Sequence, residues 1–204
     1  MGRILVTGFE PFGGGATNPS WEAVSSLPNA IASHELVRVE LPVEFDAAFA
    51  RLRGAIEASD PSLVLCVGQA GGRARVTPEF VGINWRGARI PDNAGRQPNG
   101  ERIVGEAPDA LFSTLPVAEM VRMATRGGVP AGVSYTAGTY VCNELLFCLL
   151  DYLREGRPDV RGGFVHLPYL PEQVAALGTD MPSMSLAVAT RGLELMLAAC
   201  LDVS

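Results

Sequence analysis

The sequence predicts an α/β fold in which parallel strands alternate with crossover helices. Short apolar runs alternate with amphipathic stretches along the chain, as in sheets whose consecutive strands are joined by helices. Residues 63–67 form a continuous apolar run of strand length, which is typical of the middle of a parallel sheet. The 204 residues are enough for one substantial core, and they contain no repeat, low-complexity tract or linker. One domain spanning residues 1–204 is therefore predicted.

The predicted elements follow from the short apolar runs and the periodic segments. Strands are expected at residues 4–6, 36–43, 63–67, 132–135 and 163–166. Helices are expected at residues 19–27, 45–58, 117–126, 143–154 and 183–201. In the helix expected at 45–58, the apolar residues Phe45, Phe49, Leu52 and Ile56 recur at helical spacing. Residues 79–98 are rich in turn residues and indicate a hairpin or an excursion away from the sheet.

Composition narrows the possible functions. The net charge of −6 and the lack of a Lys/Arg-rich stretch disfavour nucleic acid or an anionic membrane as partner. No apolar run approaches the roughly 18–20 residues of a membrane span, and the apolar start is too short for a secretory signal. We therefore expect a cytoplasmic protein. Only 19% of the residues are charged, below the roughly 25% of typical soluble chains, which indicates surface buried against other subunits.

The cysteines do not form a metal-site pattern. They lie at Cys66, Cys142, Cys148 and Cys200, with no Cys-x-x-Cys spacing, and the chain has only two histidines. A structural zinc site is therefore not expected. In the cytosol all four side chains are expected to be reduced thiols.

Unusual residues follow the ends of several predicted strands. A Gly-rich segment at residues 8–15 follows the first strand, a second at residues 68–73 follows the third, and His166 ends the last. Ligands bind outside the carboxyl ends of the strands in open α/β sheets, so these segments are expected to meet at one site. Neither segment matches a dinucleotide or P-loop motif, and we interpret their glycines as conformational.

Cys142 and His166 are the candidate catalytic pair. Cys142 follows a turn of small residues and precedes the predicted helix at 143–154, where the helix macrodipole favours a thiolate. An imidazole within reach would hold a thiolate–imidazolium pair or act as a general base. The alternative is that Cys142 is a buried core residue, as free cysteines usually are. The convergence of several segments on one edge of the sheet favours catalysis. The second histidine, His34, is given no role.

Glu79 and Asp92 are the candidates for a third catalytic residue. Glu79 lies among apolar neighbours, and Asp92 lies close to Arg89 in the turn-rich stretch. Their spacing does not choose between them, because triads are recognised by geometry. Arg89 either pairs with a carboxylate or donates hydrogen bonds to a developing oxyanion. Phe9 and Phe12 are either caps of the core or walls of a small pocket.

An ordered set of strings carries a family resemblance. The strings are Gly8-Phe9-Glu10-Pro11-Phe12-Gly13-Gly14, Asn18-Pro19-Ser20-Trp21-Glu22-Ala23-Val24, Gly68-Gln69-Ala70-Gly71-Gly72-Arg73, Pro78-Glu79, Ala88-Arg89-Ile90-Pro91-Asp92-Asn93, and the runs that contain Cys142 and His166. Together they resemble the pyroglutamyl-peptidase I (pyrrolidone-carboxylate peptidase) family of cysteine peptidases, in the family's order and over most of the chain.

The resemblance implies a fold, a reaction and a set of site residues. The implied fold is a single α/β/α sandwich around a twisted, mostly parallel mixed sheet, assembled as a homotetramer. The implied reaction removes N-terminal pyroglutamyl residues from peptides by acyl transfer to a thiolate. Cys142 would be the nucleophile, His166 the base and acid, and Glu79 the residue that orients the imidazole. No metal or cofactor is expected, because nucleophile and base are both side chains. Substrate-binding or supporting roles are implied for Phe9, Phe12, Gln69, Arg89, Ile90, Asp92 and Val141.

Two positions depart from the family's pattern. Tyr140 stands where phenylalanine is expected, which places a hydroxyl near the nucleophile. Trp85-Arg86-Gly87 replaces a usually more acidic stretch, which could change subunit contacts or the rim of the pocket.

Two other hypotheses belong to different classes. A phosphorolytic transferase acting on nucleosides would use a Gly-rich loop for phosphate and would not need a reactive thiol. An inactive binding protein would keep the pocket without the chemistry, but Cys142, His166 and Glu79 are all intact. Activity that requires phosphate and survives alkylation of thiols would favour the transferase.

Overall fold

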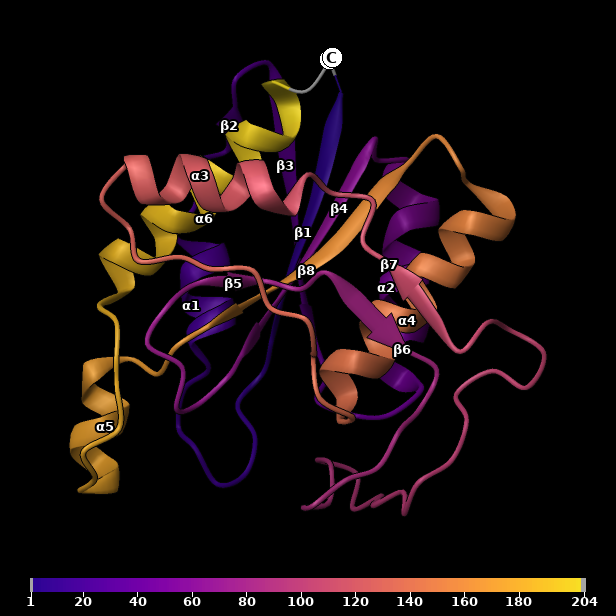
Figure 1. The fold of residues 1–204 in the computed structure, drawn as a ribbon, viewed down its shortest axis with the longest axis horizontal. Coiled ribbons are helices and arrows are strands. Elements are labelled where there is room, and N and C mark those ends of the chain that lie inside the picture. Colours follow the sequence, from indigo (N-terminus) through magenta and orange to yellow (C-terminus); the bar gives the residue numbers. More distant parts are fainter. Residues whose placement is uncertain (1, 203–204) are drawn as a thin grey trace.

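The computed structural model describes residues 2–202 and places a mixed sheet between two helical layers (Figure 1). The sheet has the strand order β2-β3-β1-β4-β8-β5. Its strands are β1 (Arg3–Phe9), β2 (Ala30–Ile31), β3 (His34–Leu41), β4 (Leu63–Gln69), β5 (Thr77–Pro78) and β8 (Arg161–Leu167). The four long strands β3, β1, β4 and β8 run parallel, and the short edge strands β2 and β5 pair antiparallel. The mostly parallel mixed sheet is therefore confirmed.

Helices cover both faces of this sheet, as Figure 1 shows. One layer consists of α1 (Pro19–Ser25), α3 (Val117–Arg126) and α6 (Leu186–Asp202), and the other of α2 (Ala47–Ser59) and α4 (Val141–Gly156). Successive side chains of a strand point to opposite faces. In β1, Ile4 and Val6 accordingly join the first core, whereas Leu5 and Phe9 join the second. The chain therefore folds as the expected α/β/α sandwich.

Most predicted elements exist close to their expected bounds. The helices predicted at 45–58, 117–126 and 143–154 correspond to α2, α3 and α4, and α6 begins slightly later than predicted. The helix predicted from residue 19 is α1, whose start is fixed by Pro19 in its first turn and by Asn18. Oδ1 of Asn18 accepts a hydrogen bond from the backbone N–H of Ser20 at 3.1 Å, as an N-cap residue does.

The strand predicted at residues 132–135 is wrong. This segment runs beside residues 76–80 and makes only isolated bridges, at Ala131 with Val76 and at Ser134 with Glu79. Pro78 lies between the two bridged positions, and a proline has no N–H to donate to a ladder. The pairing is therefore interrupted before it becomes a regular strand.

The excursion expected at residues 79–98 is present and extends further along the chain. It begins with β6 (Val81–Ile83), which pairs antiparallel with β7 (Ala110–Phe112) in a separate small sheet. Between them, the buried Asn84 holds the loop together, since Oδ1 accepts from Ile103 N and Val104 N and Nδ2 donates to the Val104 carbonyl. The short strands β2, β5 and β7 and the helix α5 (Pro171–Leu177) were not predicted.

The parallel strands all end at one edge of the sheet, and this edge positions the site. Gly68 near the end of β4 is in register with His166 near the end of β8, and β1 ends beside them at Phe9. The helix α4 begins at the same edge with Val141 and Cys142. The expected meeting of separate segments at the carboxyl ends of the strands is therefore observed. None of the helices within residues 2–202 combines the length and apolar character needed to cross a membrane.

Candidate active site

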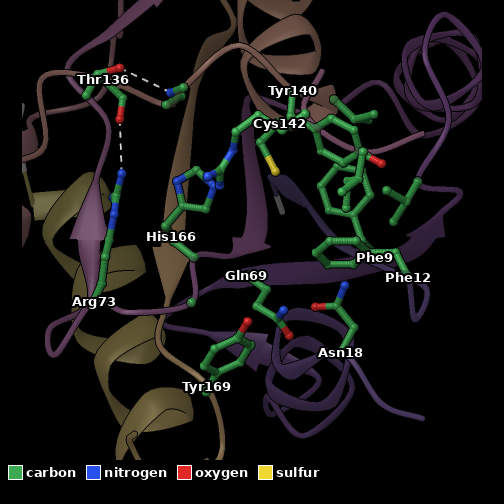
Figure 2. A pocket seen from close by; sticks show the side chains of 18 residues that line it. Phe9, Phe12, Asn18, Gln69, Arg73, Thr136, Tyr140, Cys142, His166 and Tyr169 are labelled. Atoms are coloured by element: carbon green, nitrogen blue, oxygen red, sulfur yellow. Dashed lines mark hydrogen bonds between the residues drawn. The ribbon is translucent and has the colours of Figure 1, made fainter. Parts of the chain in front are cut away.

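A pocket of about 480 Å³ opens at the carboxyl ends of β1, β4 and β8. Figure 2 shows the sulfur of Cys142 pointing into this space, with the ring of His166 on one side and Phe9 and Phe12 on the other. Gln69, Asn18 and Tyr169 lie across from the sulfur. The sequence-predicted residues that line the pocket are Phe9, Phe12, Gln69, Arg89, Ile90, Val141, Cys142 and His166. Glu79 and Asp92 lie behind the wall.

Cys142 is the second residue of α4 and packs closely on β4. The loop before the helix turns at Gly138, whose φ of +78° lies in the region that favours glycine. A Cβ added at Gly68 would lie 3.1 Å from Sγ of Cys142 and 2.7 Å from the ring of Phe164. Glycine at position 68 therefore allows the thiol to sit directly over the end of β4.

Polar side chains anchor the first turn of α4. Oδ1 of Asn143 accepts from the N–H of Ile83 at 3.0 Å, and Nδ2 donates to the carbonyls of Ile83 and Trp85 at 2.9 Å. Within residues 2–202, the backbone N–H groups of Val141 and Cys142 have no hydrogen-bond acceptor. The first N–H groups of a helix are unpaired by geometry, so these two are free to bind an oxygen in the pocket.

His166 and Glu79 form a buried pair. Nδ1 of His166 lies 2.7 Å from Oε1 of Glu79, and the two side chains are 3% and 0% exposed. Glu79 is held there by its backbone, because its N–H donates to the Phe164 carbonyl of β8 at 2.8 Å. A carboxylate on Nδ1 fixes the proton there and leaves Nε2 as the basic nitrogen. No hydrogen bond within the described residues joins the ring to the thiol of Cys142, although both line one wall.

Burial dominates the ionisation of the thiol and the imidazole. Burial raises the pKa of the Cys142 thiol to about 12, and the charge of Glu79 acts in the same direction. Burial also lowers the pKa of His166 below its usual value, which Glu79 only partly offsets. Both shifts favour the neutral thiol and the neutral imidazole, and of the two modes expected from the sequence they support general-base activation. The expectation that the helix macrodipole favours a thiolate stays a prediction, because Cys142 is only partly buried and its sulfur points into the pocket.

The surroundings of Glu79 favour its carboxylate form. Burial alone would raise its pKa, but the hydrogen bond and charge of His166, the side chain of Ser134 and the charge of Arg73 together lower it below the usual value.

Asp92 supports a loop and does not touch the imidazole. Its side chain is 6% exposed, and Oδ2 accepts from Phe45 N at 2.9 Å. Oδ1 accepts from the N–H groups of Ala94 and Arg96 at 3.0 and 2.7 Å. Of the two candidate acids, geometry therefore pairs Glu79 with the imidazole, and Asp92 shapes the segment that carries Arg89 and Ile90 into the pocket wall.

The remaining predicted residues form the wall. Phe9 is 2% exposed and serves both the core and the pocket, whereas Phe12 is half-buried. Ile90 is 45% exposed beside them. Arg89 is exposed, and no carboxylate of the described residues pairs with it, so its guanidinium is available to the pocket.

The two departures from the family pattern have defined places. The hydroxyl of Tyr140 donates to the Pro91 carbonyl at 3.0 Å and is therefore engaged away from the nucleophile. Arg86 pairs with three carboxylates at 2.8–2.9 Å, those of Asp46, Glu101 and Glu144. It therefore ties the excursion to the first turn of α4 and does not line the pocket.

Sequence reasoning missed several residues of the wall. They are Asn18, Arg73, Thr136 and Tyr169. Asn18 and Arg73 lie in strings that were singled out, and each follows soon after a strand that ends at the site. Their position shortly after these strands is the sequence feature that could have identified them as residues of the pocket wall. Thr136 and Tyr169 carried no comparable signal.

Comparisons with known proteins agree with this geometry. A family model described as pyroglutamyl peptidase matches residues 2–202. A pyrrolidone-carboxylate peptidase of Bacillus velezensis is 47% identical over 95% of this chain and 89% of its own, and one of Erwinia tasmaniensis is 50% identical over 100% and 94%.

Solved structures show the same fold. The crystal structure of pyroglutamyl peptidase I from Bacillus amyloliquefaciens superposes with a TM-score of 0.96 at 45% identity, covering 99% of this chain and 96% of that one. Pyrrolidone carboxyl peptidase from Thermococcus litoralis gives 0.94 at 36% identity, covering 99% and 94%. These relatives do not support the transferase hypothesis. The chain belongs to the pyroglutamyl peptidase family of cysteine peptidases.

Proposed function

We propose that Cys142, His166 and Glu79 carry out the reaction of this family, the removal of an N-terminal pyroglutamyl residue from a peptide. The supporting observation is the buried His166–Glu79 pair, 2.7 Å apart, in the wall that also holds Cys142. Cys142 is the one cysteine of the chain that lines this pocket. Within the pair, Glu79 orients the imidazole ring, and His166 acts as the general base and then as the general acid.

The proton transfers follow from the ionisation of the groups. Nε2 of His166 takes the thiol proton as Sγ of Cys142 attacks the pyroglutamyl carbonyl, and Glu79 stabilises the imidazolium that forms. The imidazolium then protonates the leaving amine as the C–N bond breaks, which leaves a thioester. A water molecule that gives its proton to the same imidazole hydrolyses the thioester and restores the thiol. Because nucleophile and base are side chains, this sequence needs no metal or cofactor.

Oxyanion stabilisation is assigned to the start of α4. The unpaired N–H groups of Val141 and Cys142 lie in the first turn of α4, the same turn that carries the nucleophile, so they are the nearest preorganised donors for the carbonyl oxygen that becomes negative during attack. Arg89 brings a positive charge to the same wall. The preorganised donors are fixed by the Asn143 anchor, so they do not have to reorganise during the reaction.

The pocket wall fits a neutral lactam. Phe9, Phe12, Ile90 and Val141 offer apolar surface for the ring, and Gln69 offers an amide. Oε1 of Gln69 accepts from Nε2 of Gln173 at 2.9 Å, which orients its own NH₂ group as a donor for the lactam carbonyl. Asp92 supports this wall through its loop.

Replacing Phe12 with alanine is expected to lower kcat/KM for pyroglutamyl substrates by about 10–100-fold, because an apolar wall of the ring site is lost. The rate at which a small alkylating agent modifies Cys142 should stay unchanged. Phe49→Ala is the matched control, since Phe49 is also half-buried but packs on Tyr152 away from the pocket. Efficient cleavage of N-terminal glutamyl or glutaminyl peptides by the unaltered enzyme would contradict the pocket model, because their charged amine does not suit this wall.

Replacing Glu79 with glutamine is expected to lower kcat by about 10²-fold, the lower end of acid–base contributions. Glutamine can still accept from Nδ1, and Arg73 favours its oxygen at that position, but the negative charge that stabilises imidazolium is lost. Steady-state kinetics on a pyroglutamyl-linked chromogenic amide measure the loss. Unchanged kcat would show that Glu79 is not coupled to the reaction.

We also propose that the chain is one domain that self-associates, as a homotetramer, in the cytoplasm. The family match over residues 2–202 supports a single domain. An exposed aromatic cluster supports self-association: Phe80 packs its ring against Phe112 at 5.2 Å and against Tyr135 at 5.7 Å. Phe112 and Tyr135 are 63% and 70% exposed, which favours burial of these rings against a second copy. Light scattering of the purified protein, with Phe112→Asp as comparison, measures the assembly.

A further inference from the structure

One arginine contacts the carboxylate that holds the imidazole. Arg73 lies between β4 and β5, and its Nη1 donates to Oε1 of Glu79 at 2.6 Å. The same oxygen lies 2.7 Å from Nδ1 of His166, so it accepts from both side chains. Two further hydrogen bonds fix the guanidinium, from Nη1 to Oγ1 of Thr77 at 2.5 Å and from Nη2 to the Thr136 carbonyl at 3.0 Å. Figure 2 shows the last of these at the edge of the pocket.

Glu79 has few groups that compensate for its burial. Its side chain is fully buried, and Oε2 has no hydrogen-bond partner among the described residues, although the side chain of Ser134 also lowers the pKa of the carboxyl. A buried carboxylate without a charged partner takes up a proton to avoid the cost of desolvation. Apart from His166, Arg73 is the one basic side chain within residues 2–202 that pairs with it. Arg73 is itself partly exposed, so its own charge remains solvated.

We infer that Arg73 is a positioning residue of the reaction, which keeps Glu79 ionised and aimed so that Nδ1 of His166 donates and Nε2 stays free to accept the thiol proton. This inference rests on the proposed roles of Glu79, His166 and Cys142. Arg73 acts through Glu79 and does not replace any of the three.

The charge of Arg73 also affects the proton affinity of the pair. Glu79 lies behind the ring of His166, and Arg73 contacts Glu79 and also lines the pocket. The other charged or titratable groups around the pocket are Cys142, Arg89, Tyr140 and Tyr169. Burial lowers the pKa of His166 most, and Glu79 raises it. The charge of Arg73 is a smaller effect that lowers it further. Glu79 and His166 titrate as a coupled pair, and removing a nearby cation makes the pair bind an extra proton at higher pH. In that protonated pair Nε2 carries a proton and cannot act as a base.

The test compares Arg73→Gln, Arg73→Lys and the control Arg75→Gln by pH profiles of kcat/KM. Arg75 is exposed and forms no ion pair within the described residues, so its variant removes the same charge without touching Glu79. We expect Arg73→Gln to move the acid limb upward by about one pH unit and to lower kcat at pH 7 by about 10–100-fold. Arg73→Lys should keep the limb near its original position, because the point charge remains, with a smaller loss of kcat. Arg75→Gln should match the unaltered enzyme.

The imidazole titration gives a second, activity-independent readout. The chain has two histidines, so ¹⁵N-histidine NMR of the full chain resolves His166 from His34. The His166 transition should move upward in Arg73→Gln and stay in place in Arg75→Gln. The inference would be overturned if the acid limb of the kcat/KM profile of Arg73→Gln coincided with that of the unaltered enzyme and its His166 transition did not move. Failure of the proposed catalytic roles would give a different result. His166→Ala would retain activity, while the His166 transition of Arg73→Gln would still move upward in the NMR titration.

Discussion

Cys142→Ser is expected to lower kcat/KM for a pyroglutamyl-linked chromogenic amide by about 10⁴-fold or more. A neutral imidazole can deprotonate a thiol far more readily than a hydroxyl, and serine therefore loses the nucleophile while nearly keeping the shape of the wall. Assays at matched protein concentration, with circular dichroism to confirm the fold, measure the effect.

Cys148→Ser is the matched control, because Cys148 lies on the same helix. Burial raises the pKa of Cys148 to about 12, and its thiol does not line the pocket. The same holds for the pKa values of Cys66 and Cys200. Alkylation that abolishes activity should accordingly map to Cys142. Near-normal turnover in Cys142→Ser would show that another group attacks the carbonyl.

His166→Ala is expected to lower kcat by about 10²–10⁴-fold, because one imidazole serves as base and acid in successive steps. His34→Ala should leave kcat unchanged, since His34 begins β3 at the end of the sheet opposite to the pocket. The two substitutions remove the same side chain from one protein, so the comparison controls for the general effect of losing a histidine. A comparable loss in both variants is the result that this account does not allow.

Much of the fold could be predicted because its signals are local. The run at residues 63–67 lies within β4, and the spacing of Phe49, Leu52 and Ile56 lies within α2, so each pattern reflects the environment of one element, whereas Phe45 lies just before α2. The helix α5 escaped prediction because none of its residues is buried, so it has no apolar periodicity. The strand predicted at 132–135 failed because its regularity depended on Pro78, which is distant in sequence.

The site was predictable where residue type limits the choice. Two histidines and a cysteine at a helix start leave few catalytic pairs, and the ordered strings indicated the family. Spacing alone left Glu79 and Asp92 open, the resemblance implied Glu79, and the structure shows that Glu79 contacts the imidazole whereas Asp92 binds backbone N–H groups. The effect of burial on the pKa of Cys142 could not be predicted from the sequence either, since burial is a property of the packed fold. The contact of Arg73 with Glu79 could not be inferred for the same reason.

Trapping of the acyl-enzyme tests the central claim most directly. The enzyme is mixed with an excess of pyroglutamyl substrate, quenched in acid during turnover, digested and analysed by mass spectrometry. The account predicts that one pyroglutamyl acyl group is attached to the peptide that contains Cys142, and that enzyme alkylated beforehand at Cys142 carries none. An acyl group on any other residue, or full turnover by enzyme alkylated at Cys142, would contradict it.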